Sequence, residues 1–239
     1  MRRALTVVLL SLLALAAGCG SEDGGEGGGG SSSGGDLGSP RTETSRTETE
    51  RAGGGCEQVD APEPKPDGGA QPPKDALDPK ATYDVVVATN CGDFTIRLDQ
   101  QAAPETAASV AALARSGFYD GTIFHRVVSG FVIQGGDPTG TGSGGPGYST
   151  RDKPPADATY TRGVVAMAKT GAEAPGTAGS QFYVVTGEDA GLPPEYAIVG
   201  EVREGLETTA AIDALGDPAV GDGPPRQPVV IESAKVVER

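Results

Sequence analysis

Histidine and cysteine are scarce in this 239-residue chain, which has one histidine, three cysteines and no tryptophan. A single histidine without an acidic cluster argues against a catalytic metal site, which needs several ligands close together. A Ser–His hydrolase is poorly supported as well, because no G-x-S-x-G motif is present and His125 would have to act as its base. In a regular strand His125 points away from Arg126, so we expect a structural, hydrogen-bonded histidine that faces the interior if Arg126 faces a binding groove.

Positive charge is also in short supply. The chain has 19 Lys and Arg against 33 Asp and Glu, for a formal net charge of −14. Nucleic-acid binding needs clustered Lys and Arg for phosphate contacts, so we expect no nucleic-acid partner. The acidic composition favours solubility and indicates nothing about a substrate.

Long apolar runs are confined to residues 1–18, MRRALTVVLLSLLALAAG, which are typical of a secretory signal and too short for a comfortable membrane span. The string LALAAGC, ending at Cys19, resembles a bacterial lipoprotein signal, although Ala16 stands where leucine is more common. This resemblance implies lipidation of Cys19 and a protein held at the extracytoplasmic face of the cell membrane by its lipid alone. The alternative is an ordinary secreted protein cleaved after A-A-G, in which Cys19 has no role.

The remainder of the chain divides by composition. Residues 19–55 are rich in Gly, Ser, Thr and Glu and bury too little apolar surface to fold, so we expect a disordered tether. Residues 56–80 are rich in Pro and Asp and are expected to run along the surface of a folded domain at 81–239. In an exported chain the two remaining cysteines, Cys56 and Cys91, favour one disulfide, with two free thiols as the alternative.

Strand and helix patterns fill the folded domain. Strand patterns cover residues 83–90, 92–99, 122–128, 131–135, 163–168, 181–186, 197–204 and 229–237, and helical patterns cover 104–116 and 206–215. Because no regular βαβ alternation appears, the order favours a mostly antiparallel sheet closed into a barrel, with helices over its ends.

A glycine-rich stretch begins after residue 137. Gly140-x-Gly142-x-x-Gly145 formally matches a dinucleotide fingerprint, but that motif works only where a strand turns into a helix. Pro146 follows and no helical pattern appears nearby. The stretch is therefore predicted to be a loop.

Four blocks in order carry a family resemblance: FHRVVSGFVIQGGD at 124–137, AMA at 166–168, GSQFYV at 179–184 and VGEV at 199–202. Over residues 83–237 the chain resembles the cyclophilins, a class of peptidyl-prolyl cis–trans isomerases. The resemblance implies a mostly β fold, a closed eight-stranded antiparallel barrel capped by two helices. It also implies a monomer that isomerises Xaa-Pro bonds of exported, proline-containing polypeptides without a cofactor or metal.

The family's functional positions can be carried over by matching motifs. Arg126 matches the catalytic arginine, with Phe131 and Gln134 beside it. The substrate-binding positions are Val132, Tyr183 and Leu192 with Phe131 around the proline ring, Ala168, Lys169 and Gln181 toward the preceding residues, Gly142 in the glycine loop, and Tyr196 at the pocket edge. Each has a structural alternative, such as a surface arginine, core aromatic residues or a buried barrel glutamine.

Rotation about a prolyl amide requires neither a nucleophile nor proton transfer. The barrier of about 18–20 kcal/mol arises from partial double bonding, so a site complementary to the twisted amide lowers it. The permanently charged guanidinium of Arg126 can donate to the nitrogen as it regains its lone pair. A barrel that only binds proline-containing segments, as a chaperone at the cell surface, is the alternative function.

Departures from the family lie at the pocket edge. Gly191 stands where eukaryotic relatives have tryptophan, and Tyr196 replaces a histidine. These changes predict weak cyclosporin binding with retained activity. The segment Thr170–Ala178 is longer than in the eukaryotic pattern, which affects the expected groove shape.

Overall fold

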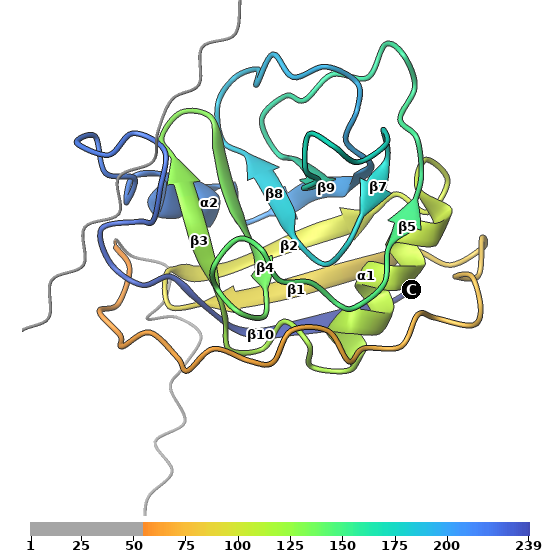
Figure 1. Cartoon of the computed structure of the whole chain (residues 1–239), viewed down its shortest axis with the longest axis horizontal. Coiled ribbons are helices and arrows are strands. Elements are labelled where there is room, and N and C mark those ends of the chain that lie inside the picture. The colour runs from red at the N-terminus through yellow and green to blue at the C-terminus, as the bar shows by residue number, and fades with distance from the viewer. Residues whose placement is uncertain (1–54) are drawn as a thin grey trace, which may run out of the picture. The chain divides into compact units, whose positions relative to one another are not determined.

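A computed structural model describes residues 55–239, so Cys19 and the predicted signal and tether lie outside the described residues. Eight strands close an antiparallel barrel in the order β1-β10-β3-β4-β8-β6-β9-β2 (Figure 1). Their bounds are β1 Tyr83–Thr89, β2 Gly92–Leu98, β3 Thr122–Val128, β4 Val132–Asp137, β6 Val164–Met167, β8 Phe182–Val185, β9 Ile198–Glu204 and β10 Val230–Glu238. A separate two-stranded sheet pairs β5 (Thr150–Arg151) with β7 (Thr177–Ala178). The predicted eight-stranded barrel is confirmed.

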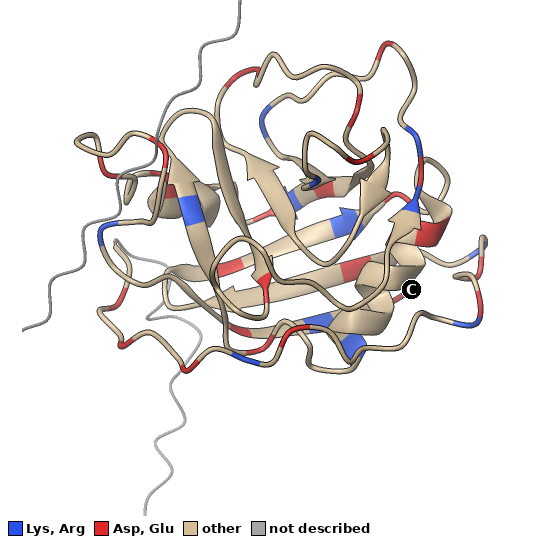
Figure 2. Ribbon diagram, viewed as in Figure 1, with Lys and Arg blue, Asp and Glu red and all other residues tan. Residues whose placement is uncertain are grey.

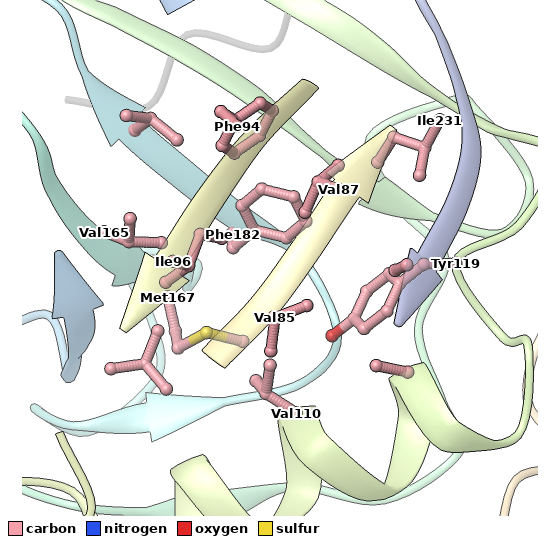
Figure 3. Packing of buried hydrophobic residues seen from close by; sticks show 14 of the residues in the cluster. Val85, Val87, Phe94, Ile96, Val110, Tyr119, Val165, Met167, Phe182 and Ile231 are labelled. Carbon is pink, nitrogen blue, oxygen red and sulfur yellow. The ribbon is translucent and has the colours of Figure 1, made fainter. Parts of the chain in front are cut away.

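The barrel interior follows from the alternation of apolar residues along the strands. In the hairpin β1–β2, Val85 lies opposite Ile96 and Val87 lies opposite Phe94, and all four side chains are buried. Figure 3 shows these residues meeting Phe182 from the far wall of the barrel. This barrel core fixes the strands on which the candidate site is built, and a second, smaller apolar cluster includes Val132, Tyr160 and Tyr183.

Two helices cover the barrel ends, α1 (Pro104–Arg115) and α2 (Leu206–Asp213), as predicted (Figure 1). Proline at the start of α1 suits a helix N-terminus, and the buried alanine-rich face of the helix packs on the barrel. At Gly205, before α2, φ is +81° and an added Cβ would lie 2.3 Å from the carbonyl oxygen of Asp93. Only glycine fits that turn.

The β3–β4 hairpin contains a bulge at His125. Phe124 pairs with Gly135 and Arg126 pairs with Gln134, which leaves His125 as an extra residue. The bulge breaks simple alternation, so Phe124 and Val127 enter the core and Arg126 turns outward. His125 itself is half-buried, and both of its ring nitrogens are buried without a hydrogen-bond partner among residues 55–239, so the expectation of a hydrogen-bonded histidine was wrong. Its ring lies under the glycine loop, 3.6 Å from where a Cβ on Gly142 would be.

Residues 56–70, which we name the N-terminal strap, run along the outside of the barrel (Figure 1). The strap begins at Cys56, which forms a disulfide with Cys91, and the Glu57 N–H donates to the Asn90 carbonyl oxygen at 2.8 Å. Farther along, the Lys65 ammonium donates to three backbone carbonyl oxygens, with distances between 2.7 and 3.2 Å. The strap is therefore fixed at both its disulfide and its lysine.

Figure 2 shows basic and acidic residues interspersed along the described ribbon. Among residues 55–239, neither helix combines the length and apolar character needed to cross a membrane.

Candidate active site

A groove of about 210 Å³ opens beside the β3–β4 hairpin. Nine of the predicted site residues line it: Arg126, Phe131, Val132, Gln134, Ala168, Lys169, Tyr183, Leu192 and Tyr196. They come from β3, β4, β8 and the loops that follow β6 and β8, because the barrel order places these elements side by side. The sequence motifs, spread over some seventy positions of the chain, thus converge on one surface.

A chain of polar side chains crosses the groove. The Arg126 Nη1 donates to Gln134 Oε1 at 3.1 Å, and Gln134 Nε2 donates to Gln181 Oε1 at 3.0 Å. Gln181 in turn donates to the Gly144 carbonyl oxygen at 2.9 Å. At the other end, Arg126 Nε and Nη2 donate to the two carboxylate oxygens of Asp222 at 2.6 and 2.8 Å. Each side chain in the chain is oriented by its neighbour.

The charge on Arg126 is secure. The hydrogen bond to the Asp222 carboxylate, assisted by its charge, raises the pKa of the guanidinium above its ordinary value despite partial burial. The same contact lowers the pKa of Asp222. The groove thus holds a positively charged side chain at neutral pH.

Apolar and aromatic side chains form the other part of the groove, which we name the slot: Phe131, Val132, Tyr183 and Leu192. The ring of Tyr183 packs edge-on against Tyr196, with ring centroids 5.7 Å apart. Tyr196 is held by Tyr160, whose hydroxyl donates to the Tyr196 carbonyl oxygen at 2.8 Å. The slot can accept a small apolar ring next to the guanidinium.

Lys169 borders the groove, and its ammonium lies 3.0 Å from Glu195 and over the ring of Tyr196. Its side chain is only 2% exposed. The ammonium is therefore already paired, and a role in gripping substrate stays a prediction for this residue.

A second groove of about 600 Å³ adjoins the first and shares Gln134, Ala168 and Lys169 with it. Gln181 and Gly142, the remaining predicted positions, line this second groove. Its wall includes residues 142–147 of the glycine loop (residues 138–147), together with Asp67 of the strap, Thr170 and Glu173. All predicted catalytic and substrate-binding residues thus border two adjoining grooves.

The glycine loop is organised around one buried carboxylate. Asp137 accepts hydrogen bonds from the N–H groups of Thr139, Gly142 and Gly144 at 2.7, 2.6 and 3.1 Å. Burial raises the pKa of Asp137, but these hydrogen bonds outweigh it, so the pKa lies below its ordinary value. His125 beneath the loop has a pKa lowered chiefly by burial.

Sequence reasoning missed Asp222 and Asp67. Asp222 stands in the string GDGPPRQP, which has neither apolar periodicity nor a recognisable motif. Asp67 lies before the first strand, in a segment read only as a surface run. The pairing of Asp222 with Arg126 can be recognised only in the three-dimensional structure, because the two residues are 96 positions apart in the chain.

The fold and the site together define a β-barrel enzyme that can hold a small apolar ring against a fixed cation. The family model described as cyclophilin type peptidyl-prolyl cis-trans isomerase/CLD matches residues 84–236. The chain therefore belongs to the cyclophilin-type peptidyl-prolyl cis–trans isomerase family, and it is a peptidyl-prolyl cis–trans isomerase.

Individual relatives agree with this assignment. Peptidyl-prolyl cis-trans isomerase A of Mycobacterium tuberculosis is 41% identical over an alignment 175 residues long that covers 66% of this chain and 94% of the relative. Peptidyl-prolyl cis-trans isomerase-like 1 of Aspergillus oryzae is 37% identical over 159 residues, covering 65% and 96%. A crystal structure of a Cryptosporidium parvum cyclophilin, solved in the presence of the dipeptide Ala-Pro, matches with a TM-score of 0.58 and 34% identity, covering 64% and 98%.

Proposed function

We propose that this isomerase acts on Xaa-Pro bonds of exported proteins, and that Arg126 accelerates the rotation by stabilising the twisted amide. The observation that carries the proposal is the placement of a charged, oriented guanidinium beside the apolar slot. Asp222 and Gln134 engage the Nε–H and one N–H on each terminal nitrogen. Nη1 and Nη2 each keep a further N–H for a peptide in the groove.

The physical basis is preferential binding of the transition state. When the amide twists out of plane, its nitrogen regains a lone pair, which can accept a hydrogen bond that the planar amide cannot. An oriented donor in a partly dry groove contributes about 2–4 kcal/mol to such a state. Burial of the proline ring among Phe131, Val132 and Leu192 would hold one side of the bond still while the other side turns.

The substrate class is inferred from the export features of the chain. Residues 1–18 and Cys19 match a lipoprotein signal, and the Cys56–Cys91 disulfide suits an oxidising compartment outside the cytoplasm. A Cryptosporidium relative was crystallised in the presence of Ala-Pro, which supports proline-containing peptides as ligands here. In this proposal, the protein is held at the extracytoplasmic face of the cell membrane by a lipid on Cys19.

The arginine is tested by measuring prolyl isomerisation of a short Ala-Pro peptide by Arg126→Ala and Arg126→Lys variants. We expect kcat/KM to fall by about 30-fold or more for Arg126→Ala, since one stabilising donor is lost. Arg115→Ala is the matched control, because Arg115 is an exposed arginine in the last turn of α1, paired with Glu238 and absent from the lining of both grooves. A loss below about threefold for Arg126→Ala, in a variant that still folds, contradicts the proposed role.

The anchor is tested separately by expressing the full chain in a bacterium that processes lipoproteins. The wild type should incorporate a labelled fatty acid and fractionate with membranes, whereas Cys19→Ala should do neither, because the thiol that carries the lipid is gone. Recovery of unlabelled wild-type protein in the soluble extracytoplasmic fraction would instead support an ordinary secreted protein.

A further inference from the structure

The carboxylate of Asp222 contacts the guanidinium of Arg126 from a loop that follows α2. Its two oxygens lie 2.6 and 2.8 Å from Nε and Nη2, a bidentate contact. The Asp222 side chain is 64% exposed and that of Arg126 is 30% exposed, so the pair lies at the outer edge of the groove. The contact covers one edge of the guanidinium and leaves the opposite edge toward Gln134.

The loop that carries Asp222 is attached to β3 next to Arg126. The Val127 N–H donates to the Gly223 carbonyl oxygen at 2.8 Å, and the two residues form an antiparallel bridge. Arg226 closes the loop, because its N–H donates to the Leu215 carbonyl oxygen at 2.9 Å and its Nη2 to that of Ala214 at 2.8 Å. Asp222 is therefore presented from a fixed backbone despite its exposure.

We propose that Asp222 is a positioning residue for the isomerisation, which holds the Arg126 guanidinium in the plane that directs its remaining N–H groups at the prolyl amide. The proposal rests on the proposed role of Arg126. A long arginine side chain has many rotamers, and a bidentate carboxylate selects one of them more sharply than a single hydrogen bond does. Gln134 fixes the guanidinium from its other edge. Orientation before substrate arrives is what makes a donor effective in the transition state.

A positioning role of Asp222 can be distinguished from an effect of its negative charge on Arg126. The guanidinium stays protonated with or without its partner, because its ordinary pKa is far above neutral. Removal of the Asp222 carboxylate therefore leaves Arg126 charged and has two effects. The guanidinium becomes free to take other orientations, and the electrostatic potential around it becomes more positive. Loss of orientation predicts slower catalysis, whereas a carboxylate that merely damped the cation would predict faster catalysis when removed.

The first experiment compares Asp222→Asn with Asp217→Asn, a matched loss of one carboxylate from the same loop. Asp222→Asn keeps the side-chain size but puts an amide N–H where the bidentate contact needs an acceptor. With an Ala-Pro peptide we expect kcat to fall by about tenfold and KM to stay within about twofold, with Asp222→Glu recovering part of the loss. Asp217→Asn should leave both constants within about twofold. A kcat for Asp222→Asn within twofold of wild type, or above it, overturns the proposal.

The second experiment repeats Asp222→Asn in an Arg126→Lys background. If Asp222 acts through the guanidinium, the second substitution should lower kcat by less than about twofold further. A full tenfold further loss would show that Asp222 acts on the fold or the substrate instead, and it overturns the proposal. If Arg126 variants lose activity and Asp222→Asn does not, only the positioning role fails. Full activity in the Arg126 variants would instead remove the proposed function of the arginine itself.

Discussion

The slot and the glycine loop border the same connected grooves but are held in place by different means. The slot residues Val132 and Tyr183 lie on neighbouring barrel strands, where Val132 pairs with Val185 and Gln134 pairs with Tyr183. Their positions follow from the register of β4 and β8 and from the core behind those strands. Forming the barrel therefore places this half of the slot, while Phe131 and Leu192 lie in the adjoining turn and loop.

The glycine loop has no such ladder. From below it is held by the carboxylate of Asp137, which is fully buried. From outside it is held by the strap: the Gly68 N–H donates to the Gly145 carbonyl oxygen at 3.0 Å, and the Gly145 N–H donates to Asp67 at 2.8 Å. Alongside, the Ala70 N–H donates to the Pro146 carbonyl oxygen at 3.0 Å.

Two parts of one site are thus held in place by different contacts: strand pairing in the slot, and hydrogen bonds to Asp137 and the strap in the loop. The slot depends on residues 84–236, the part that matches the family, and should be as stable as the barrel. The loop depends also on the strap, which lies before that part and is tied by the Cys56–Cys91 disulfide. Contacts of the loop can thus be altered while the slot stays intact.

The largest effect is expected from removing the disulfide. In a Cys56→Ser/Cys91→Ser variant, the unfolded chain regains the entropy of a loop that spans 35 residues, which costs about 3–4 kcal/mol of unfolding free energy. Because the slot and Arg126 do not depend on this crosslink, kcat/KM for a short Ala-Pro peptide should stay within about twofold at 25 °C. Denaturant titration and the isomerisation assay measure the two quantities on the same preparation.

Reduction of the wild type with a thiol provides the control, since it opens the same bond without changing a side chain. Both samples should lose similar stability. If activity on the short peptide falls tenfold while the variant is still folded, the slot and the strap are coupled and the comparison above fails.

The sequence predicted the residues of the slot better than the contacts of the glycine loop, and the reason is physical. Strand alternation and the family motifs located Val132, Gln134 and Tyr183, which lie on β4 and β8, because a strand's side chains follow from local pattern and register. The bulge at His125 could not be read in this way, since it is set by which residues of β4 pair with β3. Asp222 could not be found either, because its partner is 96 residues away in the chain.

The strap shows the same limit. Its composition predicted a surface course, and its cysteine predicted the disulfide that the structure contains. Most of its hydrogen bonds with the glycine loop join two backbone groups, and backbone pairing outside regular strands leaves no mark in residue type. The Asp67 carboxylate is the exception, since it accepts from the Gly145 N–H. Its partner is a backbone group 78 residues away, so in the sequence Asp67 looked like an ordinary surface acid.

The smallest expected effect comes from the buried hydroxyl of Tyr183, one of the slot residues. Tyr183 is 4% exposed, and its hydroxyl has no hydrogen-bond partner among residues 55–239. Burial accordingly raises the pKa of this phenol. Removing a buried, unpaired hydroxyl relieves its desolvation cost, so Tyr183→Phe should stabilise the protein by up to about 1 kcal/mol, with Tm rising by about 2–4 °C and kcat/KM unchanged within about twofold. Tyr160→Phe is the matched control with the opposite sign: its hydroxyl donates to the Tyr196 carbonyl oxygen and accepts from the Tyr196 N–H at 3.0 Å, and its loss should cost about 1–2 kcal/mol. Calorimetry of the two variants measures both changes in unfolding free energy. Equal destabilisation by Tyr183→Phe and Tyr160→Phe would mean that the Tyr183 hydroxyl has a hydrogen-bond partner in solution, and the expected gain in stability would be wrong.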